Sequence, residues 1–586
     1  MKILLIQPPI RDFYQTSIRT QPIGLAYLAA SLQMHGHEVE ILDCQTDKKR
    51  SIPIPSELSY LRDFYPFHDQ SPFKLFTGYY HFGIGWDEIR RRIEDSKADV
   101  FGISSNFTPY HGEALEIARM IKDLSGRKTV VMGGAHVSCD PENVLKNSFV
   151  DSVVLGEGEV RFPLLLEQIG KGKVENIEKI DGIGYRRDGE IRINPLQTYI
   201  QDLDSLPHPA RELLHLDRYR IRKKRSTMII TSRGCPHGCA YCSAHLVMGN
   251  SFRSRTPEAI MKEMMECQDR YGIQIFDIED DNFSLDQDRA TQLMDLIIEN
   301  FGEEKIGLSA MNGISFASLD RKLLRLMKKA GFKTINLSYV SIDPSTKERM
   351  RRPKPTTEFD KILDIAEQVG LNIIAYVILG MPDQTIEEMV NTLIYLMGKR
   401  VLIGPSIYYP THGTPLFERC KKECILPPHL CQWRSSAFPI ETDTLNRLDM
   451  VTLFRLARVI NFIKGKMDEE EFDEGMTWKE LYQVLKEKDK AEEKDKNKDE
   501  ITAVDEVGGS ALSTMRSAPW ERSKNIAVTW ANLILLLFEE RSFFSLKKDS
   551  GGRISVSKEN SSKKVLDCFF ERAWQKSILK SFSSFI

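Results

Sequence analysis

Three cysteines lie close together in the stretch Thr231-Ser-Arg-Gly-Cys-Pro-His-Gly-Cys-Ala-Tyr-Cys-Ser243, at Cys235, Cys239 and Cys242. The apolar run from Met228 to Ile230 precedes them and predicts a strand, and the glycines and proline predict a turn. Thiolates bind soft metals, so a turn that carries three of them predicts a metal site. Iron–sulfur and zinc sites usually take four protein ligands, so three cysteines leave one coordination position without a protein ligand.

Two alternatives are unconnected buried cysteines and a tetrahedral zinc site that takes His237 or His245 as its fourth ligand. The spacing of the thiols, Tyr241 in the second gap and the preceding strand favour a cluster instead. The motif resembles the Cys-x3-Cys-x-aromatic-Cys signature of the radical S-adenosylmethionine (SAM) superfamily. This resemblance implies a [4Fe-4S] cluster on the three cysteines, with SAM on the fourth iron, and one-electron cleavage of SAM to a 5′-deoxyadenosyl radical.

Length and composition bound the remaining possibilities. At 586 residues and about 150 residues per domain, the chain is expected to hold three or four units. A net charge of −2 gives no electrostatic reason to bind nucleic acid. The longest apolar run, residues 526–538, falls short of the ~20 residues that cross a bilayer, and no signal peptide is recognised. We therefore expect a cytoplasmic protein with no membrane span and no nucleic-acid partner, in which ten cysteines serve metal binding rather than disulfides.

Strand and helix patterns alternate over residues 1–195, which predicts an α/β domain with a Rossmann-like, doubly wound parallel sheet. The stretch from Thr46 to Tyr80 interrupts this pattern and is expected to be irregular. Ligands of such sheets bind at the carboxyl ends of the strands. The chain has neither a Gly-x-Gly-x-x-Gly nor a P-loop motif, so we expect a ligand other than a nucleotide. The residues expected to line this crevice are Ser104, Ser105, Gly133, Gly134, His136, Gly156, Glu157 and Gly158.

The segments Gly-Ile-Ser-Ser, Gly-Gly-Ala-His-x-Ser and Gly-Glu-Gly-Glu end three of these strands, in that order. They resemble the cobalamin-binding (B12-binding) domain that precedes the barrel in the cobalamin-dependent branch of the radical SAM enzymes, which implies that the crevice residues contact cobalamin. The chain lacks the Asp-x-His-x-x-Gly motif of other cobalamin domains, so the resemblance implies a base-off cofactor without that histidine ligand. The alternative is a Rossmann-like domain that binds nothing and only docks on the barrel.

Residues 196–420 begin with a Pro-rich linker and continue with six strand–helix repeats, which predict a partial (β/α)6 barrel related to the TIM type. The last of the six strands is predicted at Ser406 to Tyr409. Its strand ends resemble SAM-binding segments of the family, although Val340 replaces a glutamate of that pattern. The acidic end Glu279-Asp280-Asp281-Asn282 has a simpler alternative interpretation as a solvated helix cap. The SAM contacts that the resemblance implies are Tyr241, Asp280, Asp281, Ser341 and Gly380.

Residues 421–586 predict a mostly helical C-terminal region, with amphipathic helices at 444–464 and 530–538. A flexible charged linker is expected near residues 485–515. Cys420, Cys424 and Cys431 lack a turn-rich spacing and are interpreted as unrelated cysteines.

The resemblance implies a class B radical SAM methyltransferase that methylates an unactivated carbon. One SAM methylates cob(I)alamin, and a second yields the radical that activates a small-molecule or peptide substrate. An external one-electron reductant of the flavodoxin or ferredoxin type is the expected partner. A cobalamin-dependent cyclase or rearrangement enzyme without methyl transfer and a cobalamin or cluster sensor remain alternatives. A methylthiotransferase is disfavoured, because residues 1–195 offer only Cys44 and Cys139 for a second cluster.

Overall fold

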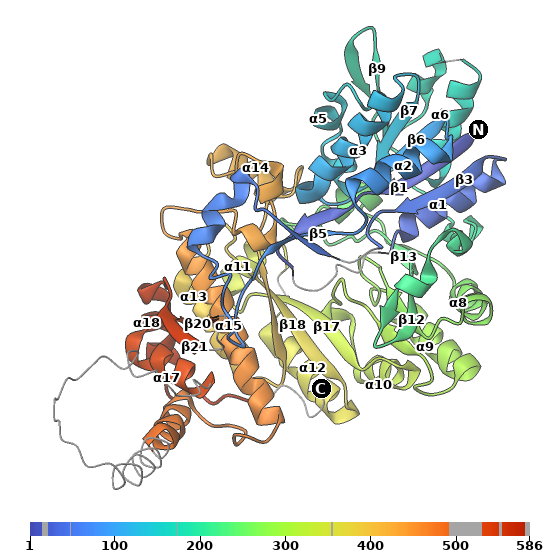
Figure 1. The fold of residues 1–586 in the computed structure, drawn as a ribbon. Helices are drawn as coiled ribbons and strands as arrows, with labels where there is room; N and C mark the ends of the chain where they lie inside the picture. The colour runs from blue at the N-terminus through green and yellow to red at the C-terminus, as the bar shows by residue number, and fades with distance from the viewer. Residues whose placement is uncertain are drawn as a thin grey trace, which may run out of the picture. The chain divides into compact units, whose positions relative to one another are not determined.

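The chain folds into two compact units (Figure 1). The computed structural model describes residues 1–14, 21–46, 49–172, 174–352, 355–490, 530–549 and 554–579. Unit 1 comprises Met1–Leu58, Gly78–Pro382 and Ser406–Ile440, and unit 2 comprises Ser59–Thr77, Asp383–Pro405 and Glu441–Ile586. Unit 1 thus combines most of the first two predicted domains, and the division at residues 195 and 420 stays a prediction.

A seven-stranded sheet in the order β10-β9-β8-β7-β6-β1-β3 forms the N-terminal part of unit 1. Strands β3, β1, β6, β7 and β8 run parallel, which confirms the predicted parallel sheet. An antiparallel hairpin, β9–β10, adds an edge that the sequence did not predict. The strands are β1 (Lys2–Gln7), β3 (Glu38–Asp43), β6 (Val100–Ser104), β7 (Thr129–Gly133), β8 (Ser152–Val154), β9 (Ile183–Arg187) and β10 (Glu190–Ile193).

Helices cover both faces of this sheet, because alternate residues of its buried strands point to opposite sides. Ile3 and Leu5 of β1 belong to a core with α1 and α6, and Leu4 and Ile6 belong to another core with α2, α3 and α5. The sheet is therefore doubly wound, with a topological switch point between β1 and β6. The helices are α1 (Ile23–Met34), α2 (Trp86–Ser96), α3 (His111–Leu124), α4 (Ala135–Cys139), α5 (Pro141–Leu145) and α6 (Gly158–Gly170).

Six strands of the predicted barrel region correspond to the predicted repeats, and the short strands β11 (Arg220–Ile221), β13 (Ser232–Arg233) and β14 (Arg253–Ser254) also lie there. β12, β15 and β16 pair in parallel, as do β17 and β18, and isolated bridges from Leu308 and Ile314 link these two groups. The last strand begins at Leu402, earlier than the predicted Ser406. It continues through Gly404 and Pro405, although these two residue types usually indicate a turn. The strands are β12 (Lys224–Ile229), β15 (Ile275–Ile278), β16 (Gly307–Ser309), β17 (Thr334–Val340), β18 (Asn372–Leu379) and β19 (Leu402–Ile407).

The helices between these strands begin at capping side chains. Thr256, Asp286 and Asp320 each accept a hydrogen bond from the backbone N–H three residues on, which satisfies one free donor of the first turn. These caps fix where each strand-end loop stops and so hold the loops that form the site. The helices of unit 1 in this region are α7 (Ala244–Met248), α8 (Pro257–Tyr271), α9 (Gln287–Phe301), α10 (Arg321–Ala330), α11 (Pro344–Arg349), α12 (Thr356–Val369) and α14 (Pro415–Lys422).

The stretch predicted to be irregular, Thr46 to Tyr80, contains short regular elements. β4 (Arg50–Ile52) and β2 (Ile10–Asp12) pair with β5 (Tyr79–Phe82) in a small antiparallel sheet of unit 1. A 3-10 helix, η1 (Ser56–Asp63), follows β4. The boundary between the units lies inside this helix, because Leu58 belongs to unit 1 and Ser59–Thr77 belongs to unit 2.

Unit 2 is mostly helical, as predicted for the C-terminal region. Trp478 is fully buried at its centre, in edge-to-face contact with Phe538, Phe569 and Phe570. A hairpin, β20–β21, was not predicted, and residues 491–515 of the expected linker lie outside the described residues. In the described part of the chain, no helix is both long and apolar enough to span a membrane. The elements are α13 (Ile386–Met397), α15 (Arg447–Asp468), α17 (Trp530–Glu540), β20 (Phe544–Lys548), β21 (Ile554–Lys558) and α18 (Lys563–Ala573).

Candidate functional site

The three cysteines lie on one loop between β13 (Ser232–Arg233) and α7. Gly234 and Gly238 turn this loop with positive φ values of 81° and 54°, a conformation that glycine adopts without strain. Cys239 is buried, and Cys235 and Cys242 are half-buried. Burial and the neighbouring cysteines raise the pKa of the Cys242 thiol to about 11, so a metal is needed to hold it as a thiolate at neutral pH.

The geometry of this loop suits a cluster better than a single ion. Among the described residues, no three His, Cys, Asp or Glu side chains converge closely enough to hold one metal ion. The tetrahedral zinc alternative needs four such donors around one point. A [4Fe-4S] cluster binds each thiolate to a different iron and requires no such convergence.

The acidic end of β15 holds the cysteine loop in place. The Asp280 carboxylate accepts hydrogen bonds from the Thr231 backbone N–H at 2.7 Å and from the Ser232 hydroxyl at 2.7 Å. The Asp281 carboxylate accepts one from the Gly234 N–H at 3.0 Å. These two aspartates therefore bind the loop that carries the cysteines, and their predicted contact with SAM stays a prediction.

The segments predicted to contact SAM come together around the cysteine loop. Tyr241 packs in one apolar cluster with Val340 and with Met381, the neighbour of Gly380. Ser341 is buried, and its hydroxyl accepts a hydrogen bond from the Asp343 N–H at 3.1 Å. The roles of Tyr241, Ser341 and Gly380 toward SAM stay predictions.

Val340 has a strained backbone at the end of β17. Its φ is 72°, which is rare for a β-branched residue, and the pairing of β17 with β18 shifts register between Ser338 and Val340. Strain of this kind is usually maintained at functional sites. The residue that departs from the family pattern is thus also the residue with the unusual backbone.

A cavity of about 380 Å³ lies at the switch point of the N-terminal sheet. Met228, Ile230 and Glu279 of the barrel region also line it, so strand ends of both predicted domains meet at this cavity. Seven of the eight residues predicted to contact cobalamin are in its wall: Ser104, Ser105, Gly133, Gly134, Gly156, Glu157 and Gly158.

Gly134 allows the loop after β7 to pack closely against the loop after β6 in the wall of the cavity. Its φ is 114°, and a Cβ atom there would lie 2.5 Å from the Asn106 side-chain oxygen and 2.7 Å from the Ser105 carbonyl oxygen. Only glycine fits this position. The wall of the cavity at this point is therefore backbone, which suits close approach of a flat cofactor.

His136, the eighth predicted residue, does not line the cavity. It is buried beside His111, with ring centroids 4.3 Å apart, and its Nδ1 lies 3.1 Å from the Thr108 hydroxyl. Burial, with His111 and His412 nearby, lowers the pKa of His136 to about 2, so this ring is neutral. Its contact with cobalamin stays a prediction.

Glu157 joins the cavity wall to the cysteine loop through buried charges. Its carboxylate accepts hydrogen bonds from Arg233 at 2.9 Å and from Arg253 at 2.8 Å, and Glu159 accepts one from Arg233 at 2.6 Å. All four side chains are at most 7% exposed. Although burial opposes the charge of Arg233, the two carboxylates raise its pKa above the ordinary value.

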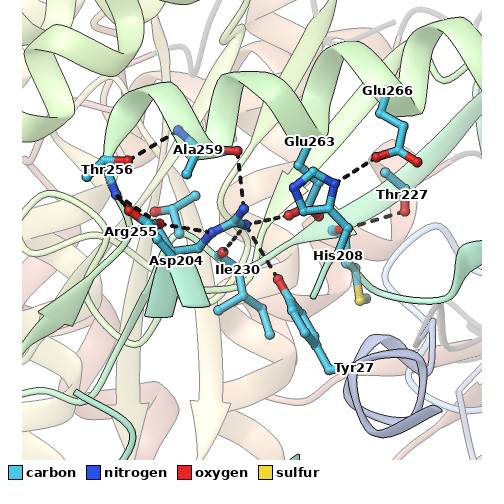
Figure 2. A network of polar contacts seen from close by, with 12 residues as sticks. Tyr27, Asp204, His208, Thr227, Ile230, Arg255, Thr256, Ala259, Glu263 and Glu266 are labelled. Atoms are coloured by element: carbon cyan, nitrogen blue, oxygen red, sulfur yellow. Dashed lines mark hydrogen bonds and ion pairs between the residues drawn. The ribbon is translucent and has the colours of Figure 1, made fainter. Parts of the chain in front are cut away.

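A second buried network supports the strand that precedes the cysteines. Arg255 donates to the Glu263 carboxylate at 2.5 Å and to the Ile230 carbonyl at 3.3 Å, and both contacts are drawn as dashed lines in Figure 2. Arg211 of the linker binds the other oxygen of Glu263 at 2.7 Å and the Met228 carbonyl at 2.8 Å. The linker and α8 thus fix the end of β12. Neither network was expected from the sequence, because each includes partners that are far apart in the chain, such as Arg233 with Glu157 and Arg211 with Glu263.

The carboxyl group of Glu279 lines the barrel side of the cavity, and the buried carboxyl group of Asp277 lies next to it. Glu279 accepts a hydrogen bond from Asn312 at 2.8 Å, and Asp277 accepts one from Ser309 at 2.6 Å. Burial and the charge of Asp277 raise the pKa of Glu279 to about 7. No described cation forms an ion pair with either carboxylate, so no opposite charge offsets the cost of burying the charge of Glu279.

Models of two protein families match separate parts of this chain. Residues 229–396 match the model of the radical SAM superfamily, and residues 77–166 match the model of the B12 binding domain. The chain belongs to the B12-binding radical SAM enzymes. Its cofactors are a [4Fe-4S] cluster, SAM and cobalamin, and the three-cysteine loop and the switch-point cavity fit the cluster and cobalamin.

Individual relatives span most of the chain. An uncharacterized methyltransferase of Pyrococcus horikoshii is 28% identical, and the match covers 71% of this chain and 83% of the relative. Cytidylyl-2-hydroxyethylphosphonate methyltransferase of Streptomyces wedmorensis is 26% identical, covering 74% and 84%. The structure of the radical SAM methyltransferase TsrM of Kitasatospora setae shares the fold, with a TM-score of 0.56 and 18% identity over 72% of this chain and 76% of that one.

Proposed function

We propose that this radical SAM enzyme transfers a methyl group to an unactivated carbon of its substrate. The carrying observation is the cavity at the switch point, whose wall combines the glycine loops of the cobalamin domain with barrel strand ends. A substrate held there would lie between these glycine loops and Ile230, at the end of the strand that leads into the cysteine loop. The two relatives named methyltransferases support the same reaction class.

The proposed ligand sets follow from the positions of the side chains. Cys235, Cys239 and Cys242 would hold the cluster, and the loops after β6, β7 and β8 would hold cobalamin. Tyr241, Ser341 and Gly380 are proposed as contacts of SAM, as are Asp280 and Asp281. When bound, the cluster and SAM supply the substrate radical, and cobalamin supplies the methyl group. A reductant of the flavodoxin or ferredoxin type is proposed to deliver the electron.

The chain's own residues bind, shield and position. Met228, Ile230 and Met248 give the cavity an apolar wall that excludes water from a reactive radical. Glu279 is the polar group on the barrel side, where it can accept a hydrogen bond from a substrate and orient it. The networks around Glu157 and Glu263 hold the strand ends that carry these residues.

Cofactor content is the first test. Protein purified without oxygen and with hydroxocobalamin is expected to contain about four iron atoms and one cobalt atom per chain. Cys239→Ala should lose the iron and all SAM cleavage, whereas Cys424→Ala, at an exposed cysteine, should keep both. Iron in Cys239→Ala at the wild-type level would refute the ligand assignment.

The products of SAM identify the reaction without knowledge of the substrate. Reduced holoenzyme given SAM should release S-adenosylhomocysteine in an amount matching its cobalamin, in addition to 5′-deoxyadenosine. A ring-forming enzyme would release 5′-deoxyadenosine alone, and a sensor would consume no SAM. Either of these outcomes would exclude the methyltransferase.

A further inference from the structure

Arg352 lies beside the cysteine loop and has no carboxylate partner. Its Nη1 donates a hydrogen bond to the Cys239 sulfur at 3.8 Å, and its side chain also interacts with that of Tyr241. Its backbone N–H is bound to the Lys347 carbonyl at 2.7 Å, which ties it to α11. The side chain is half-buried, and no described Asp or Glu forms an ion pair with it.

Other buried arginines of unit 1 are matched by carboxylates. Arg233 faces Glu157 and Glu159, and Arg434 pairs with Asp12 at 3.0 Å. A charge withdrawn from water is costly without such a partner. The neighbours of Arg352 are the sulfur of Cys239 and the side chain of Tyr241, and neither is a carboxylate. The guanidinium is therefore placed for an anion that the cysteine loop acquires later.

We propose that Arg352 raises the reduction potential of the [4Fe-4S] cluster, because its positive charge lies beside the sulfur of Cys239. The inference rests on the proposed assignment of the three cysteines as cluster ligands. Reduction adds one electron, and no proton, to a cluster already made negative by thiolates. A fixed positive charge beside one thiolate stabilises the reduced state more than the oxidised state.

Asn282 provides an internal comparison. Its side-chain N–H donates to the Cys235 sulfur at 3.9 Å, and the residue is 4% exposed. A neutral amide acts through a dipole, whose field weakens faster with distance than that of a full charge. Arg352 is therefore the stronger of the two influences on the sulfurs, and Asn282 shifts the potential in the same direction by less.

The test is a redox titration of the cluster, followed by electron paramagnetic resonance, in the absence of SAM. Dithionite with viologen mediators supplies the electron. For Arg352→Gln we expect the equilibrium constant of reduction to fall about tenfold, which is ~59 mV for a one-electron couple. Arg352→Lys keeps the charge and should stay within about threefold of the wild type. Arg349→Gln, in α11, removes an arginine that does not touch a cysteine and should have no effect.

An unchanged potential in Arg352→Gln that still binds four irons would overturn the proposal. So would a potential that changes only when SAM is present, because Arg352 would then act on the SAM carboxylate. If Arg352→Gln binds no cluster, Arg352→Lys decides. If Arg352→Lys has the wild-type reduction potential, the role of the charge is supported. If its equilibrium constant of reduction is tenfold lower than that of the wild type, the role of the charge is refuted.

This result is separable from the proposed function. If the three cysteines do not hold a cluster, the wild-type protein lacks the iron and its signal. If only the inference on Arg352 is wrong, the wild-type cluster is present and its potential is insensitive to residue 352.

Discussion

Replacing Glu157 by Gln should destabilise the junction between the cavity wall and the cysteine loop. The Glu157 side chain is fully buried, and it binds both Arg233 and Arg253. Arg233 keeps Glu159 in the variant, but Arg253 loses the carboxylate with which it forms its ion pair and remains 3% exposed. Removing one partner of a buried ion pair costs about 3–5 kcal/mol, which is a large part of the stability of a typical domain.

Hydrogen exchange measured by mass spectrometry gives this loss locally. Peptides over residues 155–162 and 228–235 should exchange faster in Glu157→Gln, with a local opening free energy lower by about 3 kcal/mol or more. Glu167→Gln is the control, because Glu167 is an exposed residue of the same helix, α6, and pairs only with Lys171. We expect no change in exchange for that variant.

A double variant distinguishes the effect of leaving Arg253 unpaired from the effect of changing the packing around residue 157. Adding Arg253→Met removes the unpaired guanidinium and fills its space with an apolar chain, so Glu157→Gln/Arg253→Met should be more stable than Glu157→Gln alone. The reasoning would be refuted by a loss under ~1 kcal/mol in Glu157→Gln, since a buried unpaired charge costs more than that. Equal stability of the single and double variants would refute it as well.

Two further predictions concern the cavity. Burial raises the pKa of Glu279 to about 7 from 4.5, so its contribution to stability is complete below pH 4.5 and is lost as the pH rises through 7. Glu279→Gln should remove that part of the pH dependence of unfolding in urea, and an unchanged profile would contradict the pKa shift. Gly134→Ala should weaken cobalamin binding at least tenfold in absorbance titrations while iron content stays normal, because its Cβ would strike the Ser105 carbonyl. Gly112→Ala, with open space around it, is the matched control, and equal affinity in both variants would exclude a role for that clash.

Local signals were enough to predict most of the regular elements. Val100–Ser104 is a buried strand bounded by polar residues, and Pro257–Tyr271 is a helix with Thr256 before it and Gly272 after it. The last barrel strand was misplaced because Gly404 and Pro405 indicate a turn, whereas the backbone continues through them as strand. The β9–β10 hairpin did have a local signal, because its two-residue loop is Asp188-Gly189, with φ values of 53° and 82°.

The site was predictable only as far as its motifs reach. The glycines and serines at the strand ends lie together because parallel strands end at one edge. The partners of those motifs were not predictable, since Arg233 is 76 residues from Glu157 and Arg352 is 113 residues from Cys239. Nor does a motif show where its side chains point, as the buried ring of His136 illustrates.

Unit 2 consists of three segments that are separated in the chain, so its parts are synthesised at different times. Ser59–Thr77 and Asp383–Pro405 belong to a unit whose remaining part is Glu441–Ile586. The first two segments therefore leave the ribosome before most of their packing partners exist. The cofactor-binding unit has all of its residues once Ile440 has been made, while unit 2 has to wait for the rest. A chain that stops near residue 440 would thus contain Ser59–Thr77 and Asp383–Pro405 without the rest of unit 2. These two segments would be exposed to chaperones and proteases.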